Sequence, residues 1–90
     1  SIWAALTDKE LVVMGEGLDL FTHAVPSALR GKTLAESDIG ARTGLTVVAA
    51  FSTDRELVTQ VHPGMVLQNG MDLLMVGTDA QHHDFVSRYG

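Results

Sequence analysis

The stretch that decides the fold is LRGKTLAESDIGARTGLTVVAAF, which occupies residues 29–51. Within it, Thr33 and Glu36 have the spacing of a capping box, in which each residue binds the other's backbone amide at the start of a helix. We expect a brief helix over residues 34–42, with Leu34, Ala35 and Ile39 facing inward, and Gly44 is placed to end it in the left-handed conformation. The apolar run 45–51 then predicts a buried central strand.

Three further strands are predicted from apolar or alternating runs that are bounded by turn residues. They cover residues 18–25, 56–61 and 71–77. Residues 52–55 have the composition of a hairpin turn, so 56–61 is expected to be the antiparallel partner of 45–51.

A terminal helix is predicted after the last of these strands. Thr78 and Asp79 cap its beginning. Phe85, Val86 and Tyr89 follow at spacings of three and four residues, which gives the helix an inward apolar face. His82 and His83 fall largely on the other faces, where we expect them to be solvated.

Residues 1–17 are expected to form an N-terminal linker or short helix, ahead of a domain that spans 18–90. Thr7 and Glu10 match a second capping box, which favours a helix over residues 8–14. The β-branched pair at Val12 and Val13 suits a strand equally well.

The predicted order of the domain is β-α-β-β-β-α, which belongs to the α+β class. Strands that follow one another directly favour a mixed or mostly antiparallel sheet, with the helices on one face.

The composition describes one small domain with an interacting surface. A chain of 90 residues buries roughly 60% of its unfolded surface. Its hydrophobic fraction of 46% is high for that size, so we expect part of the apolar surface to meet another subunit.

The net charge of −5 argues against nucleic-acid binding. The absence of cysteine suits a reducing compartment, and no apolar run approaches the roughly 18 residues of a membrane span.

The sequence contains no recognisable catalytic constellation, so we expect no enzyme. Asp79 and His83 have the spacing of a helical metal-ligand pair, but His82 and His83 are adjacent and point about 100° apart on a helix. A single pair is common by chance, and no metal site is expected.

Two side chains are candidates for ligand binding. Arg42, at the helix end, could pair bidentately with a phosphate or carboxylate, or it could be solvated where a cation favours the helix dipole. His62 precedes Pro63 at a rigid turn, where it could overhang a pocket or stand on the surface.

These elements resemble the RCK C-terminal domain, also called the TrkA-C domain, over residues 18–88. The pattern of that family is matched in its first half by Leu29, Gly31, Leu34, Ile39, Gly44 and 45–49, and in its second half by Pro63, Leu67, Gly70, 73–77 and Phe85. Two departures stand out. Met71 separates Gly70 from Asp72, and His62 replaces the usual asparagine.

The resemblance implies a cytoplasmic regulatory domain of a potassium or other cation transport protein. It implies a homodimer attached to a membrane-embedded channel or transporter, with an effector bound in the dimer cleft. The effectors used in the family are cyclic dinucleotides, nucleotides and divalent cations. The cleft is expected to be lined by Arg42, Val61, His62 and Pro63. The alternative is a structural dimerisation module that binds no ligand.

Overall fold

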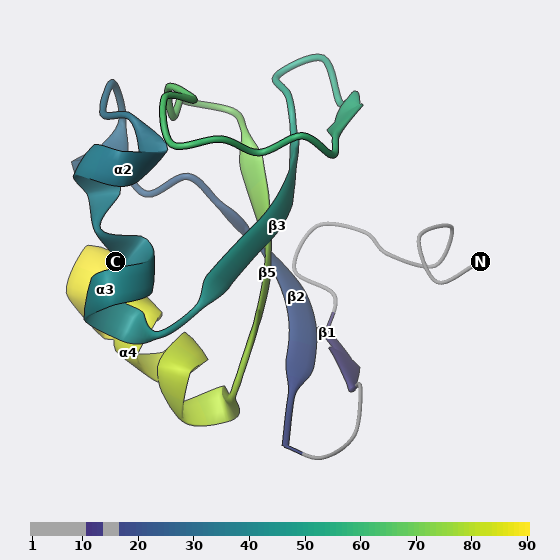
Figure 1. The fold of residues 1–90 in the computed structure, drawn as a ribbon, viewed down its shortest axis with the longest axis vertical. Coiled ribbons are helices and arrows are strands. Elements are labelled where there is room, and N and C mark those ends of the chain that lie inside the picture. The colour runs from purple at the N-terminus through teal and green to yellow at the C-terminus, as the bar shows by residue number, and fades with distance from the viewer. Residues whose placement is uncertain (1–10, 14–16) are drawn as a thin grey trace.

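The structure, a computed structural model, describes residues 11–13 and 17–90. Within them, five antiparallel strands form one sheet in the order β1-β2-β5-β3-β4. The strands are β1 (Leu11–Val13), β2 (Asp19–Ala24), β3 (Thr46–Phe51), β4 (Leu57–Val58) and β5 (Asp72–Gly77) (Figure 1). The predicted α+β class is confirmed, and every strand pairing is antiparallel.

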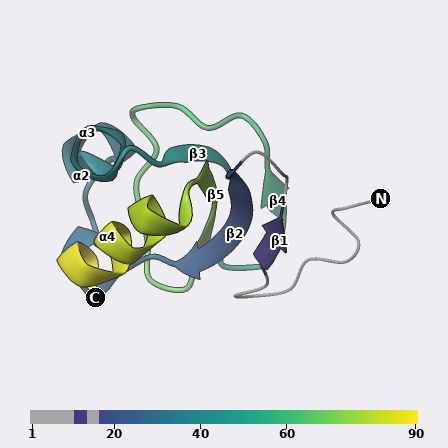
Figure 2. The same cartoon turned by 90° about the horizontal axis from the view of Figure 1, so that it is seen from below.

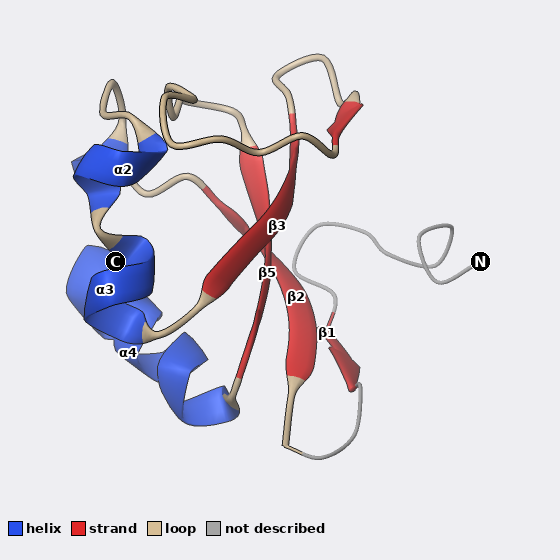
Figure 3. Ribbon diagram, in the orientation of Figure 1, coloured by secondary structure: helices blue, strands red, loops and turns tan. Residues whose placement is uncertain are grey.

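The helical segments of this part of the chain lie together on one side of the sheet. They are η1 (Ser27–Leu29), α2 (Leu34–Ser37), α3 (Ile39–Thr43) and α4 (Asp79–Tyr89). The view from below shows α2, α3 and α4 on one face of the central strands, while β1 and β4 curve away from them (Figure 2). The two-layer arrangement that the sequence predicted is therefore the one observed (Figure 3).

The last strand of the chain takes the central place in the sheet. β5 pairs with β2 along one edge and with β3 along the other. Its residues Leu73, Leu74 and Met75 are fully buried, so both faces of this strand are covered. This double burial explains why its sequence reads as a continuous apolar run rather than an alternating one.

The prediction of a helix over residues 8–14 is wrong for residues 11–13, the part of that range that the structure describes. Residues 11–13 form β1, which pairs with β2 in the register Leu11 to Phe21. The strand alternative for the β-branched pair therefore holds. The capping box at Thr7 and Glu10 lies outside the described residues.

The helix expected over residues 34–42 is two short helices. Asp38 adopts a left-handed conformation, with φ of 56°, between α2 and α3. The Ser37 hydroxyl donates to the Leu34 carbonyl (2.5 Å) and accepts from the Ile39 amide (3.3 Å). Such local side-chain bonds compete with the helical ladder, and here they accompany its interruption.

The cap signals of this segment are confirmed. Thr33 Oγ1 accepts from the Glu36 amide at 3.2 Å, and the Thr33 amide donates to Glu36 Oε1 at 2.8 Å. These bonds hold the pKa of Glu36 below its usual range, the bond from the Thr33 backbone being the largest cause. Gly44 ends α3 with φ of 81°, as predicted.

The hairpin after β3 is confirmed, but its second strand is much shorter than predicted. β4 contains two residues, which pair with Ala50 and Phe51 at the end of β3. The ladder between β3 and β5 also skips Val48, which forms a bulge between Val47 and Ala49. Bulges and very short strands are usual at sheet edges.

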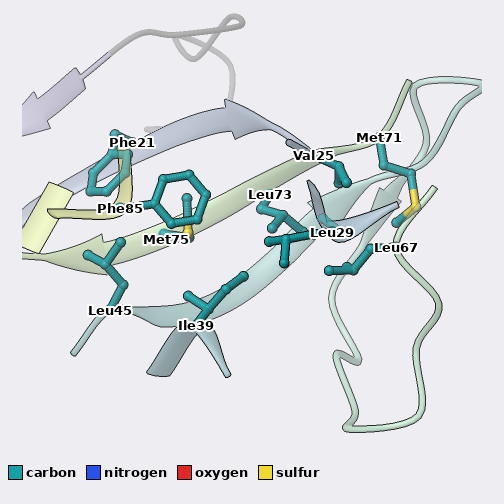
Figure 4. Packing of buried hydrophobic residues seen from close by; sticks show 11 residues of the cluster. Phe21, Val25, Leu29, Ile39, Leu45, Leu67, Met71, Leu73, Met75 and Phe85 are labelled. Atoms are coloured by element: carbon teal, nitrogen blue, oxygen red, sulfur yellow. The ribbon is translucent and has the colours of Figure 1, made fainter. Parts of the chain in front are cut away.

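The main hydrophobic core lies between the sheet and the helices. In Figure 4, Phe21, Met75 and Phe85 meet at one end of it, and Leu67 and Met71 lie at the other. Of the expected inward residues of α4, Phe85 is fully buried and Tyr89 is half-buried. Val86 is 43% exposed, so its inward assignment is wrong.

Candidate functional site

A groove of about 370 Å³ separates α2 and α3 from the beginning of β3. Its helical wall includes Ala35, which was expected to face the core and is instead exposed. Asp38 contributes the one carboxylate of the lining. The residues that line the groove are Leu34, Ala35, Asp38, Ile39, Gly40, Ala41, Leu45, Thr46 and Val47.

The strand that borders this groove is open along two thirds of its length. In the described part of the chain, β4 pairs only with Ala50 and Phe51, so residues 46–49 have a strand neighbour on the β5 side alone. Four residues correspond to about 13 Å of free strand edge. Within this stretch Val48 is 38% exposed. An open edge of this kind is a template for pairing with another chain.

Residues 63–67 are held against the entry to α2 by a run of backbone hydrogen bonds. The amide of Ala35 donates to the Pro63 carbonyl at 2.9 Å, and the amide of Leu34 donates to the Met65 carbonyl at 2.8 Å. Two more bonds, from Gly31 to the Leu67 carbonyl and from Leu67 to the Lys32 carbonyl, continue the pairing. Pro63 is thereby placed beside Ala35, at one end of the groove.

Arg42 does not line the groove, and it contacts the lining only through Asp38. Its Nε lies 3.8 Å from Asp38 Oδ2, and both side chains are more than half exposed. Such a surface pair is worth less than about 1 kcal/mol, so Arg42 can exchange Asp38 for an anionic ligand at little cost. Arg42 and Pro63 were both predicted for the cleft; neither lines this groove, and each contacts one residue that does, Asp38 and Ala35 respectively.

His62 does not line the same groove. It lines a second hollow, of about 400 Å³, together with Gln60, Met65 and Gln68. Val61 is half-buried and lines neither hollow. Of the four predicted residues, His62 alone lines one of these two hollows, while Arg42 and Pro63 each contact a residue of the groove wall.

The ion pair between Arg55 and Asp72, which anchors the hairpin between β3 and β4, was not predicted from the sequence. Arg55 Nη1 lies 2.9 Å from Oδ2 of the buried Asp72, and its guanidinium lies 5.9 Å from the centre of the Phe51 ring. Arg55 has a left-handed φ of 71°, which the composition of the turn does not predict. The pair ties the turn before β4 to the first residue of β5.

A second missed feature is the packing of histidine against the core. The His82 ring stacks on Phe21 with centroids 3.9 Å apart, although it was expected on a solvated face of the helix. The alternation of Phe21 and His23 along β2 is the signal that could have found this, because residues two apart share one face of a strand.

Asp79 and His83, which have the spacing of a helical metal-ligand pair, form a surface contact. His83 Nε2 lies 3.9 Å from Asp79 Oδ2, with both side chains about four-fifths exposed. Among the residues that the structure describes, no three His, Cys, Asp or Glu side chains are grouped as metal ligands. None of the helices in that same part of the chain has the length and apolarity needed to cross a bilayer.

The walls of the groove are mainly aliphatic, and Asp38 is the one charged residue of its lining. The guanidinium of Arg42 lies outside the lining and contacts it at Asp38. Apolar walls with a few placed polar groups are typical of small-molecule sites.

The family model of the TrkA-C domain matches residues 20–89. The chain belongs to this family. No match was found among curated protein sequences. Among solved structures, the TrkA-C chain described here is similar to the GsuK channel bound to NAD, with 33% identity and a TM-score of 0.73. That match covers 80% of this chain but only 13% of the channel chain.

Two more distant structures share the fold of this TrkA-C domain. One is the RCK C domain of the potassium transport protein KtrA in complex with cyclic diadenosine monophosphate, at 22% identity and a TM-score of 0.69. That match covers 79% of the KtrA domain chain and 76% of this chain. The other is the RCK_C domain dimer of S. agalactiae BusR in complex with c-di-AMP, at 20% identity and a TM-score of 0.70, with 81% of this chain and 91% of that one covered.

BusR has also been solved in complex with its busAB-promotor DNA. That match has 18% identity, covers 87% of this chain and 39% of the BusR chain, and has a TM-score of 0.67. The likeness concerns the fold, and the absence of a nucleic-acid partner for this chain stays a prediction.

Proposed function

We propose that this chain is a regulatory domain that acts on a potassium or other cation transport protein in the membrane. In this proposal the domain is cytoplasmic, has no enzymatic activity, forms a homodimer and senses a small effector. Its membership of the TrkA-C family and its 33% identity to part of the GsuK channel support the proposal.

The observation that carries the proposal is the groove beside the open part of β3, residues 46–49. A strand edge of about 13 Å is long enough for pairing with the same edge of a second copy. A two-fold axis through such a contact would bring two copies of the groove together, because an isologous interface repeats each surface patch. The resulting cleft would be larger than either groove alone.

The effector of this cleft is an adenine-type nucleotide, a cyclic dinucleotide or a divalent cation. Arg42 would bind a phosphate, giving up its weak pair with Asp38. Pro63 would support the wall next to Ala35, and His62 would border the cleft from the neighbouring hollow. Val61, which lines neither hollow, would join the cleft only in the dimer. For a divalent cation, the exposed Asp38 from each copy would be the first ligands.

Regulation would follow from a shift in populations. An effector that bridges the two copies binds one arrangement of the dimer better than another, and the equilibrium moves by that difference in affinity. Because the chain spans 13% of the channel that it resembles, the gated element belongs to the partner protein or to further parts of the same protein.

Two measurements test the proposal. Light scattering at micromolar concentration should give the mass of a dimer. Melting curves with c-di-AMP, NAD, ATP and Mg²⁺ or Mn²⁺ should show one class of effector that raises the Tm. At a hundred times its Kd, a ligand should raise the Tm of a domain of this size by roughly 10–20 °C.

The alternative function is a structural dimerisation module without a ligand. A dimer whose Tm responds to none of these compounds would favour it. The predicted absence of nucleic-acid binding is checked by a gel shift with duplex DNA at low salt, where electrostatic binding is strongest. With a net charge of −5, the chain should leave the DNA unshifted.

A further inference from the structure

Four rings from β2 and α4 interlock where the helix meets the sheet. The His82 ring stacks on Phe21 at 3.9 Å, with 30° between the planes. His23 meets the edge of Phe85 at 5.1 Å and the edge of His82 at 6.5 Å. Each element thus contributes one phenylalanine and one histidine to what we call the ring joint. Two of its four members, Phe21 and Phe85, are essentially inaccessible to water.

The proton positions of His23 follow from its hydrogen bond. His23 Nδ1 lies 2.7 Å from the Ala24 carbonyl oxygen. A carbonyl can only accept, so this assigns the Nδ1 proton of neutral His23 and leaves Nε2 as its basic nitrogen. The bond also fixes the ring plane, which keeps His23 close to His82.

The electrostatic surroundings of His82 disfavour its charged form. Burial is the main cause that lowers its pKa, and the neighbouring His23 and His83 lower it further. Asp79 on α4 and Asp19 on β2 oppose this effect. Of the other helical segments that pack on α4, η1 has no titratable side chain, and the only one on α3 is Arg42, which faces Asp38.

The far end of α4 is connected to the groove. The Tyr89 hydroxyl donates a hydrogen bond to the Ser37 carbonyl at 3.0 Å. Ser37 is the last residue of α2, and the following Asp38 and Ile39 line the groove. Tyr89 also packs on Phe85, with centroids 5.3 Å apart. A continuous chain of contacts therefore leads from the ring joint through α4 to the junction of α2 and α3.

We propose that the ring joint is a pH-responsive latch: protonation of His82 loosens α4 from β2 and releases the hold of Tyr89 on the α2–α3 junction. Protonation places a cation among buried rings and 6.5 Å from a second imidazole. The latch would make the groove respond to acidification. That regulatory consequence rests on the proposed function, whereas the latch itself is a property of the chain without ligand.

The direction of the effect follows from the sign of the shift. A histidine whose pKa is lower in the folded chain than in the unfolded one binds a proton more readily after unfolding. The contribution of His82 to stability is therefore complete above its usual value of 6.5 and is lost as the pH falls through the folded pKa.

The test is amide hydrogen exchange of the ligand-free 90-residue chain at pH 7.5 and pH 5.5, corrected for intrinsic exchange rates. In the wild type, protection of α4 and of residues 37–43 should fall on acidification. In His82→Phe, which keeps a ring on Phe21 and cannot be protonated, protection should be the same at both pH values. His82→Gln is the second non-titrating variant and should behave likewise.

Two further variants locate the effect. His83→Gln removes a side chain that is 81% exposed, so the pH dependence should remain. Tyr89→Phe removes the hydroxyl alone; α4 should still loosen at pH 5.5, but residues 37–43 should no longer follow it. An unchanged pH dependence in both His82 variants would overturn the proposal. So would loss of the dependence in His83→Gln. Neither result bears on whether the groove binds a ligand.

Discussion

Helix α4 and the pair α2–α3 lie on the same face of the sheet, but they meet it in different ways. α4 closes its part of the face with the ring joint and the fully buried Phe85. α2 and α3 leave a groove beside β3, whose edge lacks a neighbouring strand over residues 46–49 within the described chain. The apolar surface under α4 is buried in the folded chain, whereas part of the apolar surface beside α2 and α3 remains exposed.

The closed interface under α4 and the open groove beside α2 and α3 should contribute differently to stability and to binding. Buried side chains at a closed interface each contribute about 1.5–3 kcal/mol through the hydrophobic effect. Exposed side chains around an open groove contribute little to folding, so the same surface is free to be selected for a partner or ligand. Substitutions should therefore sort by region: those under α4 should change the free energy of unfolding, and those around the groove should change association.

The largest expected effect is that of Phe85→Ala. It removes the central ring of the closed region and leaves a cavity, so the free energy of unfolding should fall by about 3–5 kcal/mol. Urea unfolding followed by circular dichroism measures this loss. Val86→Ala is the matched control on the same helix, since Val86 is 43% exposed, and it should change stability by less than about 0.5 kcal/mol. Equal losses in the two variants would contradict the packing described for α4.

Gly77→Ala should be the next most damaging substitution. A Cβ at this position, where β5 leads into α4, would clash with the Leu45 side chain and lie 2.6 Å from Gln81 Oε1. Overpacking of this kind costs about 1–3 kcal/mol. The loss is measured by the same urea unfolding. A Gly77→Ala chain as stable as the wild type would show that Leu45 and Gln81 move aside freely.

The sequence predicted well those features that depend on local chemistry. The capping box at Thr33, the left-handed Gly44 and the turn after β3 involve neighbours in the chain, and all three are observed. The break at Asp38 and the shortness of β4 were not predicted. Both depend on competition between local and tertiary contacts, which a pattern of residue types does not resolve.

Thr33→Ala tests whether the groove depends on the short helix beside it. Loss of the cap should cost about 1 kcal/mol, and Thr78→Ala should cost a similar amount by removing the equivalent cap of α4. Only Thr33→Ala should also weaken dimerisation or the Tm response to an effector, because α2 forms part of the groove wall. If Thr78→Ala reduced binding equally, the separation of the two regions would fail.

The same cap makes a pH prediction. The pKa of Glu36 is lowered in the folded chain, so its contribution to stability is present above its usual value of 4.5 and is lost as the pH falls through the lowered pKa. Glu36→Gln keeps an acceptor for the Thr33 amide and should reduce this acid-induced loss, as measured by urea unfolding between pH 6 and pH 3. It should leave unchanged any loss that occurs near pH 6, where His82 is involved.

The smallest stability effect expected has the opposite sign. Gly40 lies in α3 without a positive φ, and a Cβ there would come no nearer than 3.6 Å to the Leu45 carbonyl oxygen. Gly40→Ala should therefore raise the free energy of unfolding by about 0.5–1 kcal/mol. Because Gly40 lines the groove, the added methyl group should also weaken the Tm response to an effector. A more stable variant that binds its effector as well as the wild type would show that the groove is not the ligand site.

The candidate site was predicted only in part, and the reason is geometric. Residues 63–67 pair with the backbone at the start of α2, which places Pro63 beside Ala35 of the groove wall, whereas Arg42 reaches that wall only through Asp38. His62 is directed into the next hollow, since adjacent side chains at a turn diverge. The ring joint was missed because helical spacing alone assigned His82 to solvent, whereas its packing depends on the face that β2 presents.

The most direct test of the central claim is the oligomeric state of Val48→Lys, measured by light scattering beside the wild type. We expect the wild type to be a dimer and the variant a monomer, because two lysines would face each other across the paired β3 edges. The Tm of the variant at matched subunit concentration would then report the lost dimer. Val86→Lys, at an exposed apolar position of α4, should remain dimeric. A monomeric wild type, or a Val48→Lys chain that still dimerises, would contradict the account.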